Sequence, residues 1–505
     1  MGNEMNIKVK FLDISTEPMV LINAADAMKI GGKDNDRVKI EGKKAAIALL
    51  NVSDFVNEGE AVLSNDLKAK VGASNGDEVN IVYTSSPESV RSIRRKMDNE
   101  KLSKDEIHAI VQDILDNRLS KIEISAWLTA LHINGMDIDE IADFTTAMVD
   151  TGDRVEFDRS PVYDFHSMGG VPGNKITPIV VSIVASAGLM LPKTSSRAIS
   201  SACGTSDFVE TFCDVEMDAA TLKRISEEVG GVLAWGGSMN LAPVDDLVIK
   251  VEHPLGINPR AQMLASILSK KLAIGATHLV IDIPTGAGTK VPTIEVARAY
   301  ARDFMDLGDK LNIHIECAIT YADQPVGSAI GPKLEARECI RILEGEKHPA
   351  SVIEKACDLA GIILEMGGFP NGSDKAREIL DSGAAMKKFR EIVAAQGGNY
   401  DIKSSDLVPG EFVADVVSLK SGYVHTISNK DLVSIAVAAG SPSDKGAGIL
   451  LMKKKGQRVE KEDVLFQIYG DSKAKVDRAK ELAAKYKPFD IEGMLLKRIT
   501  ATRTR

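Results

Sequence analysis

Four segments of the sequence combine hydroxyl, glycine and basic residues in patterns that suit the oxygens of phosphate groups. The first, DFHSMGGVPGNK (164–175), follows a predicted strand and precedes a predicted helix. Its adjacent glycines and Ser167 leave backbone N–H groups open to an anion, and the N-terminus of the next helix adds a favourable partial charge. We expect Lys175 and the hydroxyl of Thr177 to complete this cradle. Its spacing is neither that of a Walker loop nor that of a dinucleotide-binding loop.

The second segment, KTSSRAISSACGTSDFVE (193–210), concentrates hydroxyl side chains around one arginine. Seven of them surround Arg197, namely Thr194, Ser195, Ser196, Ser200, Ser201, Thr205 and Ser206. Hydroxyls together with a guanidinium suit phosphate and sugar oxygens. A helix cap or an ordinary loop explains any single serine better, but the cluster with Arg197 and Gly204-Thr205 favours ligand binding.

The third and fourth segments are a helix and a glycine-rich turn. Residues 258–278 predict an amphipathic helix on which Ser266 and Lys270, four residues apart, share one face. DIPTGAGTK (282–290) forms a turn after a predicted strand and ends in Lys290. Ligands are expected at the carboxyl edge of a parallel sheet, where a lysine would reach a phosphate, although a solvated surface lysine is the simpler alternative.

Composition limits the kind of protein that carries these segments. The 505 residues, 44% hydrophobic and 27% charged, suggest about three or four globular domains. A net charge of −10 disfavours a general nucleic-acid binder but allows a basic pocket for a small anion. The five cysteines form no CxxC pair, which argues against a disulfide framework or a cysteine zinc site. We find no signal peptide or membrane span and expect a cytoplasmic protein.

Residues 1–84 contain an internal repeat. A shift of 41 positions aligns KIGGKDNDRVKI (29–40) with KVGASNGDEVNI (70–81), and a Val-Leu pair precedes each copy. Both copies alternate apolar and polar residues around a Gly/Asn/Asp turn, as half-buried strands do. We therefore predict a small pseudo-symmetric β-barrel, with chance similarity of two β-turn-β pieces as the alternative.

The remaining sequence predicts a multidomain α/β protein. After the linker at Thr84–Pro87, helical periodicity indicates a helical domain over 85–158, with a later helical segment near 245–275. Alternating strands and helices over 159–408 predict a mixed α/β domain with a largely parallel sheet. For the C-terminal α+β domain, 409–505, we predict short strands with turns over 422–440 and 446–470, then a helix over 472–486.

HSMGGVPGNK, SSRAISSACGTSDFVE and SILSKKLAIGA followed by DIPTGAGTK resemble the thymidine/pyrimidine-nucleoside phosphorylase family, in particular its archaeal AMP (nucleoside-monophosphate) phosphorylase branch. The resemblance extends from about residue 85 onward, and the repeated N-terminal domain is similar to the extra domain of that branch. It implies an active cleft between a helical and an α/β domain. It also implies phosphorolysis of a nucleoside 5′-monophosphate to the free base and ribose 1,5-bisphosphate, with no metal or organic cofactor. The implied partners are the nucleotide, inorganic phosphate and further copies of the chain in a homo-oligomer, without nucleic acid or membrane.

The resemblance also implies roles for particular residues. The phosphate-binding pattern falls on Ser167, Thr177, Ser195 and Thr205. The nucleotide-contacting positions are Gly170, Ser196, Arg197, Ala198, Ile199, Ser200, Ser201, Thr205, Ser266 and Lys290, and Lys270 falls where the family uses a lysine for the base. His166 is a candidate for orienting the loop or the leaving base, although a lone histidine is more often structural.

Two positions depart from the family pattern. Phe165 stands where thymidine phosphorylases carry a lysine, which weakens a purely nucleoside-directed interpretation. Asn258 stands where the archaeal enzymes carry the aspartate that gives a proton to the base. A carboxamide can form a hydrogen bond to the leaving nitrogen but does not act as such an acid. Asp245, Asp246 and Glu252 are candidate substitutes.

Three alternatives to an AMP-type phosphorylase remain open from the sequence. A pyrimidine nucleoside phosphorylase would act without the 5′-phosphate, and Phe165, Lys290 and the N-terminal domain argue against it. A phosphoribosyltransferase would need a pyrophosphate–metal site that the sequence does not show. A weakly catalytic nucleotide-binding regulator is favoured by Asn258 but disfavoured by retention of the other cradle residues.

Overall fold

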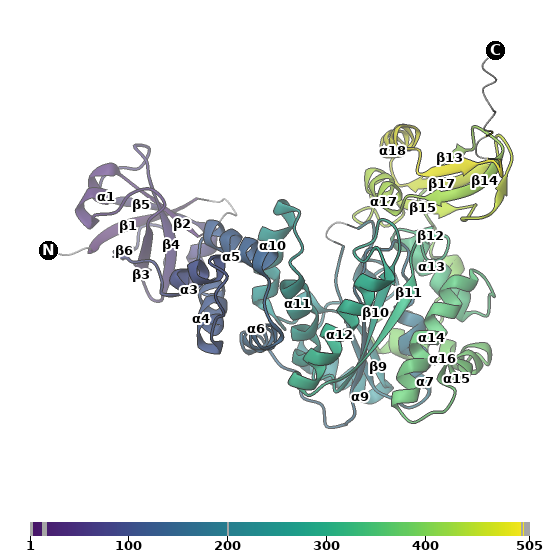
Figure 1. Ribbon diagram of the computed structural model, residues 1–505. Helices are drawn as coiled ribbons and strands as arrows, with labels where there is room; N and C mark the ends of the chain where they lie inside the picture. The colour runs from purple at the N-terminus through teal and green to yellow at the C-terminus, as the bar shows by residue number, and fades with distance from the viewer. Residues whose placement is uncertain (1–3, 13–17, 199–200, 496–497, 499–505) are drawn as a thin grey trace, which may run out of the picture. The chain divides into compact units, whose positions relative to one another are not determined.

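A computed structural model describes residues 4–12, 18–198, 201–495 and 498 (Figure 1). The chain divides into two compact units. The first contains residues up to Gly152 together with Ala242–Ser269, and the second contains Asp153–Leu241 together with the chain from Lys270 onward. Within the described residues, no helix combines the length and the hydrophobicity needed to cross a membrane.

The N-terminal strands close into a barrel in the order β1-β5-β2-β4-β3-β6. Their bounds are Glu4–Leu12 (β1), Met19–Ile22 (β2), Arg37–Glu41 (β3), Ala45–Val52 (β4), Glu60–Ser64 (β5) and Glu78–Thr84 (β6), with helices Ala24–Ile30 (α1) and Asn65–Val71 (α2). The two copies of the repeat pair with each other, because β3 runs antiparallel to β6 with Ile40 opposite Ile81. Gly31 and Gly72 end the two helices in the same left-handed conformation. The predicted pseudo-symmetric barrel is confirmed.

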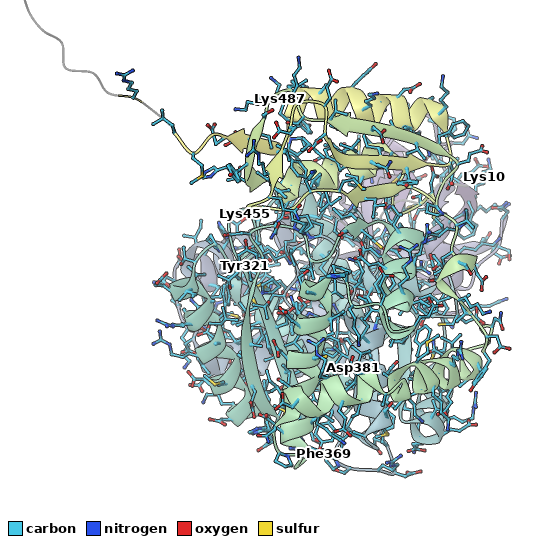
Figure 2. The ribbon with its side chains drawn as sticks, turned by 90° about the vertical axis from the view of Figure 1, so that its right-hand side faces the viewer. Lys10, Tyr321, Phe369, Asp381, Lys455 and Lys487 are labelled. Carbon is cyan, nitrogen blue, oxygen red and sulfur yellow. The ribbon has the colours of Figure 1, made fainter. Side chains whose placement is uncertain are left out.

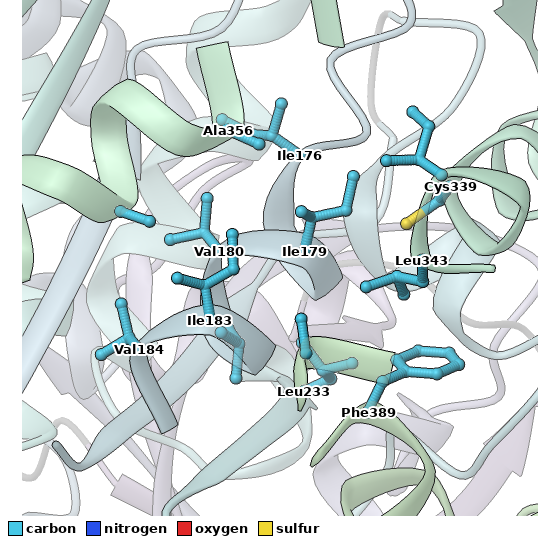
Figure 3. Close-up of a cluster of buried hydrophobic side chains, with 14 of the residues drawn as sticks. Ile176, Ile179, Val180, Ile183, Val184, Leu233, Cys339, Leu343, Ala356 and Phe389 are labelled. Carbon is cyan, nitrogen blue, oxygen red and sulfur yellow. The ribbon is translucent and has the colours of Figure 1, made fainter. Parts of the chain in front are cut away.

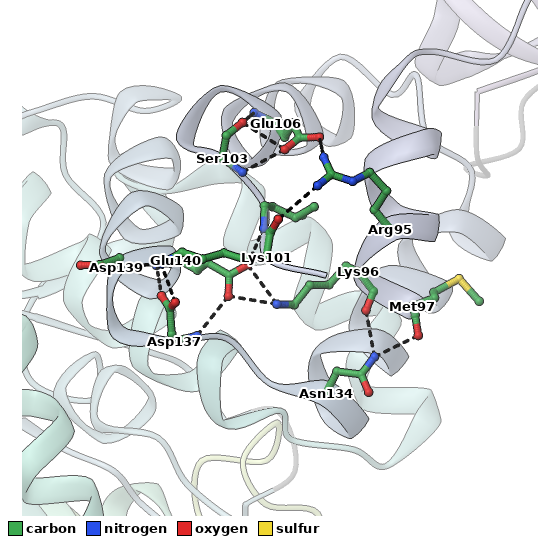
Figure 4. Close-up of polar contacts among 11 residues, drawn as sticks. Arg95, Lys96, Met97, Lys101, Ser103, Glu106, Asn134, Asp137, Asp139 and Glu140 are labelled. Carbon is green, nitrogen blue, oxygen red and sulfur yellow. Dashed lines mark hydrogen bonds and ion pairs between the residues drawn. The ribbon is translucent and has the colours of Figure 1, made fainter. Parts of the chain in front are cut away.

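Helices of the first unit pack around Trp127 and Phe144. They are Ser89–Met97 (α3), Lys104–Leu115 (α4), Lys121–Asn134 (α5), Ile138–Asp150 (α6), Pro243–Leu255 (α10) and the start of Arg260–Ala273 (α11). A capping box begins each of α4, α5 and α6, which fixes where these helices start. Lys96 and Glu140 form a buried ion pair at 2.9 Å that ties α3 to α6 (Figure 4).

The second unit begins with parallel strands. Strands His314–Tyr321 (β11), His278–Thr285 (β10) and Tyr163–Ser167 (β7) form one sheet, and Leu191–Ser195 (β8) pairs with Gly231–Trp235 (β9). A parallel bridge between Val162 and Met190 connects the start of β7 to that of β8. Helix Thr177–Ser186 (α7) is buried on every face and lies in the largest hydrophobic cluster (Figure 3).

Further helices cover this α/β region. Their bounds are Thr205–Val209 (α8), Ala219–Val229 (α9), Ile294–Leu311 (α12), Pro332–Leu343 (α13), Ala350–Met366 (α14), Gly372–Asp381 (α15) and Ala384–Ala395 (α16). Short 3-10 turns occur at Gly236–Ser238 and Ser404–Asp406. Helices α14 and α16 pack with α7 through residues such as Ala356 and Phe389, as Figure 3 shows.

The C-terminal domain combines antiparallel strands with two helices. Its elements are Phe412–Val417 (β13), Gly422–Ile427 (β14), Asn429–Ala438 (α17), Gly448–Leu451 (β15), Arg458–Val459 (β16), Val464–Gly470 (β17), Lys473–Tyr486 (α18) and Phe489–Glu492 (β18). The short strand Ala329–Ile330 (β12) pairs with β15 and so joins this domain to the α/β region. Lys455, labelled in Figure 2, contributes a backbone N–H to Gln324 Oε1 at 2.9 Å across the same border.

One prediction for this domain is wrong. Residues 429–438 form helix α17, not part of a run of short strands. Ser428 caps the helix by accepting a hydrogen bond from the backbone N–H of Asp431. Leu432, Ile435 and Ala439 recur at helical spacing and are buried, so packing outweighs the strand preference of the β-branched residues in this segment.

Candidate active site

Three of the four segments begin where a parallel strand ends. β7 ends at Ser167, β8 at Ser195 and β10 at Thr285. β7 pairs in parallel with β10, and the parallel bridge between Val162 and Met190 shows that β8 runs in the same direction as β7. The loops therefore emerge at the carboxyl edge of the sheet, where ligands bind in folds of this kind.

The Ser167 hydroxyl is held by hydrogen bonds at the start of the first loop. Its Oγ accepts hydrogen bonds from the backbone N–H of Gly169 at 3.3 Å and from Asn174 Nδ2 at 3.1 Å. Asn174 Nδ2 also lies 3.4 Å from Asp282 Oδ2, so a carboxylate on β10 orients the amide. The sequence thus links β7, its loop and β10 through one polar chain.

Gly170 and Lys290, both predicted nucleotide-contacting positions, lie against each other. Gly170 has a φ of +87°, and a Cβ added there would lie 2.9 Å from the backbone nitrogen of Lys290. Only glycine accommodates this contact without strain. The loops after β7 and β10 therefore meet at these two residues.

The expectation that Lys175 completes the anion cradle is wrong. This side chain is fully buried, and its Nζ donates hydrogen bonds to Val326 O at 3.0 Å and Glu338 Oε2 at 2.7 Å. It ties the loop to α13 instead of facing an anion. Thr177 begins α7 and is 4% exposed.

Asp207 closes the second loop. Its Oδ2 accepts hydrogen bonds from the backbone N–H groups of Ala198 at 2.7 Å and Gly204 at 2.8 Å. A Cβ on Gly204 would lie 2.6 Å from backbone atoms of residues 196–198, so the loop folds tightly back on itself. Ser196 and Ser201 are exposed on this loop. Ile199 and Ser200 lie outside the described residues.

The guanidinium of Arg197 is occupied by protein groups. It stacks over the Trp235 ring at 4.7 Å and pairs with Glu216 at 3.0 Å, with Glu210 and, more distantly, with Asp207 at 3.7 Å. Three carboxylates balance its charge. The arginine side chain therefore anchors the loop to α8 and its surroundings, a placement that its position in the sequence did not predict.

A buried cluster with excess positive charge underlies the strand ends. Asp164 is shared by Lys271, at 2.6 Å, and Lys193, at 3.5 Å, and all three side chains are buried. Burial lowers the pKa of Lys193 to about 7, although the carboxylate of Asp164 opposes this shift. Burial also lowers the pKa of His166 well below its usual value, and the charges of four lysines add to the effect, namely Lys271, Lys193, Lys270 and Lys290. The His166 imidazole is therefore neutral, and the positive charges of these four lysines act on it.

Sequence reasoning assigned no role to Asp164, Lys193, Asp207 or Lys271. Asp164 and Lys193 stand within the quoted motifs, three and two residues before the ends of β7 and β8, and this placement near the functional loops was the available signal. Lys271, adjacent to the predicted Lys270, is buried and pairs with Asp164. No local pattern distinguishes a lysine that enters a core from one that enters solvent.

In the first unit, Ser266 and Asn258 have different surroundings. Ser266 Oγ donates a hydrogen bond to Asp245 Oδ2 at 2.9 Å, and Gln262 donates one to the other carboxylate oxygen at 3.0 Å. Asp245 is fully buried, so its carboxylate fixes α11 rather than facing a ligand in solvent. Asn258 is exposed just before α11, and its amide lies 3.7 Å from Met263 Sδ.

Proteins from several organisms are similar to this chain over nearly its whole length. The chain is 51% identical over 500 residues to the AMP phosphorylase of Thermococcus kodakarensis, covering 98% of this chain and 99% of that protein. It is 46% identical to the AMP phosphorylase of Methanococcoides burtonii and 48% identical to that of Pyrococcus furiosus, covering 97–98% of this chain and 99% of each relative. The chain belongs to the AMP phosphorylase family.

Family models of single domains match three regions of the chain and agree with this membership. Residues 90–152 match the helical bundle domain of the glycosyl transferase family, and 159–386 match its α/β domain. Residues 423–489 match the pyrimidine nucleoside phosphorylase C-terminal domain. The fold is also similar to anthranilate phosphoribosyltransferase from Thermus thermophilus, with a TM-score of 0.52 and 20% identity over 61% of this chain and 99% of that one.

Proposed function

We propose that this enzyme catalyses phosphorolysis of nucleoside 5′-monophosphates, converting AMP and inorganic phosphate into adenine and ribose 1,5-bisphosphate. The observation that carries the proposal is the emergence of three anion-suited loops at one sheet edge, in a chain 46–51% identical to AMP phosphorylases over nearly its full length. The reaction places two phosphate groups near one sugar, which requires two anion sites.

The chemical step exchanges one bond for another at C1′. An oxygen of inorganic phosphate forms a bond to C1′ while the bond from C1′ to the base nitrogen breaks. The bonding electron pair leaves with the base, whose nitrogen then takes a proton. Positive charge develops on the sugar, so the two phosphates stabilise it while the protein holds them in line.

Inorganic phosphate is assigned to the strand-end hydroxyls and the start of α7. Ser167 and Ser195 end their strands, Thr177 begins α7, and Thr205 begins α8. Hydroxyl and backbone donors at these positions suit a dianion, and the α7 N-terminus adds partial positive charge. Support comes from the fixed Ser167 hydroxyl.

The nucleotide is assigned to Gly170, loop 196–201, Thr205, Ser266 and Lys290, with Lys270 near the base. The close approach of Gly170 to Lys290 supports a joint contact from two loops. We assign the contribution of Arg197 to its backbone, because carboxylates occupy its guanidinium.

Lys193 replaces the charge of the lysine that Phe165 displaces in the family pattern. Phe165 is buried, and the Lys193 ammonium lies 5.1 Å from its ring centroid. With Lys271 and a single Asp164, this gives a buried net positive charge that favours bound anions.

Assembly into a homo-oligomer is part of the proposal. Met28 and Phe55 are 79% and 81% exposed on the N-terminal domain, and Ile122 and Ile133 are 77% and 73% exposed on α5. Large apolar side chains on a surface suit protein contacts. Light scattering after size-exclusion chromatography tests this, and a monomer at micromolar concentration would contradict it.

Release of free base tests the proposed function. The purified protein is incubated with excess phosphate and AMP, CMP, UMP, adenosine or thymidine, and the bases are separated by chromatography. Phosphate-dependent release from nucleotides alone supports the proposal. Release from adenosine or thymidine indicates a nucleoside phosphorylase, and AMP binding without release, even by the Asn258→Asp variant, indicates a nucleotide-binding regulator.

A further inference from the structure

One residue of the second loop lies in the core of the C-terminal domain. Ala202 is 1% exposed and belongs to the hydrophobic cluster that includes Ala439 and Ala447. Its backbone carbonyl accepts a hydrogen bond from Ser441 Oγ at 2.6 Å, in a buried setting. The loop is therefore anchored near its end by a domain that begins some two hundred residues later.

A second connection reaches the start of the same loop. Glu210 pairs with Arg197 of the loop through one carboxylate oxygen and with Lys445 of the C-terminal domain through the other. Burial opposes ionisation of Glu210, but hydrogen bonds from these two cations and their charges lower its pKa overall, so the carboxylate stays ionised. The C-terminal domain thus holds the loop at both of its ends.

The residues assigned to inorganic phosphate depend less on this domain. Ser195 ends β8 and Thr205 begins α8, so regular structure fixes both. The described residues between them, 196–198 and 201–204, lie outside helices and strands and rely on Asp207, Ser441 and Glu210.

We infer that Ser441 and Lys445 are positioning residues, through which the C-terminal domain orders residues 196–198 and 201–204 of the second loop for the nucleotide and not for inorganic phosphate. This inference rests on the proposed assignment of that loop to the nucleotide. Removal of the Ser441 hydroxyl leaves a buried carbonyl without its donor, which favours a displaced loop.

Steady-state kinetics of the full-length Ser441→Ala variant test the inference. We expect KM for AMP to rise by about three- to thirtyfold, whereas KM for phosphate changes less than twofold. Ser441→Thr keeps the hydroxyl and is expected to recover most of the affinity. Ser434→Ala, on the exposed face of α17, is the matched control and should behave as the parent.

A second variant, Lys445→Met, tests the same inference without changing the packing around Ser441. Lys445→Met removes one of the two cations that pair with Glu210 and is expected to raise KM for AMP. In the Ser441→Ala, Lys445→Met double variant, the rise in KM should be smaller than the product of the two single effects, because both residues act on one loop. Equal rises of both KM values, or no rise in either variant, would overturn the inference. If neither the parent enzyme nor the Asn258→Asp variant releases base from AMP, the proposed function itself fails.

Discussion

Gly170 lies so close to Lys290 that a Cβ on the glycine would sit 2.9 Å from the lysine backbone nitrogen. Gly169, next to it, has a φ of +76° but no atom within 4 Å of its added Cβ. The two glycines therefore separate two effects. A side chain added at Gly169 would only strain the backbone, whereas a side chain added at Gly170 would also displace the loop that carries Lys290.

We predict that Gly170→Ala lowers kcat/KM for AMP by at least tenfold, whereas Gly169→Ala lowers it by a smaller factor. Left-handed backbone costs an alanine roughly 1–2 kcal/mol at either position, and the clash with Lys290 is added only at Gly170. Initial rates at subsaturating AMP measure the difference. Equal losses in the two variants would contradict a nucleotide contact shared by the two loops.

Asn258→Asp is expected to raise kcat for AMP by about 10²–10⁴-fold if position 258 supplies the proton, the usual range for general acid catalysis. Asn258→Ala should stay near the parent activity or below it, which separates the carboxylic acid from the loss of the amide. Single-turnover rates of adenine formation measure the step. An unchanged rate in the aspartate variant would assign the proton to another group.

The charge of Lys193 predicts a pH dependence of anion binding. Burial lowers the pKa of Lys193 to about 7, so its ammonium is charged below that pH and neutral above it. Of the neighbouring groups, His166 has a pKa well below its usual value and stays neutral, while Asp164 and Lys271 form a close ion pair. Anion affinity should therefore fall as pH rises through 7.

Sulfate measures this effect without titrating itself. We expect its inhibition constant against phosphate to rise by up to about tenfold between pH 6 and 8, following the protonated fraction of Lys193. Lys193→Met should abolish the rise, whereas Lys387→Met, at an exposed position, should leave it intact. The same slope in Lys193→Met and the parent would exclude Lys193 from anion binding.

Asp207 provides a test of loop closure. Its carboxylate accepts two backbone hydrogen bonds that close the second loop, so Asp207→Ala should raise KM for AMP at least tenfold and lower Tm by a few degrees. Asp218→Ala, which removes an exposed helix cap, should lower Tm without raising KM. Calorimetry and initial rates distinguish the two, and an unchanged KM in Asp207→Ala would show that the loop does not contact the nucleotide.

Much of this architecture could be predicted because it depends on local pattern. The repeated Gly/Asp turns predicted the barrel, and helical periodicity predicted the helical domain that contains α4, α5 and α6. The strand-end position of Ser167 and Thr285 followed from apolar runs ending in glycine-rich turns.

The errors at the candidate site concern partners that are distant in sequence. Lys175 stands beside the predicted cradle, but Glu338 lies 163 positions away and draws its ammonium into the core. For the same reason, the sequence did not predict that Lys193 and Lys271 share Asp164 or that Ser441 donates a hydrogen bond to Ala202. In each case the burial of a charge or carbonyl is decided by tertiary packing, which one sequence does not reveal.

The most direct test of the central claim follows the oxygen atoms of phosphate into the sugar product. AMP is incubated with ¹⁸O-labelled inorganic phosphate and the Asn258→Asp variant beside the parent, and the products are analysed by mass spectrometry. The account predicts adenine and a pentose bisphosphate in which the new phosphate retains its labelled oxygens, including the one bonded to C1. Ribose 5-phosphate without the label, or no sugar product from either protein, would contradict phosphorolysis of the nucleotide.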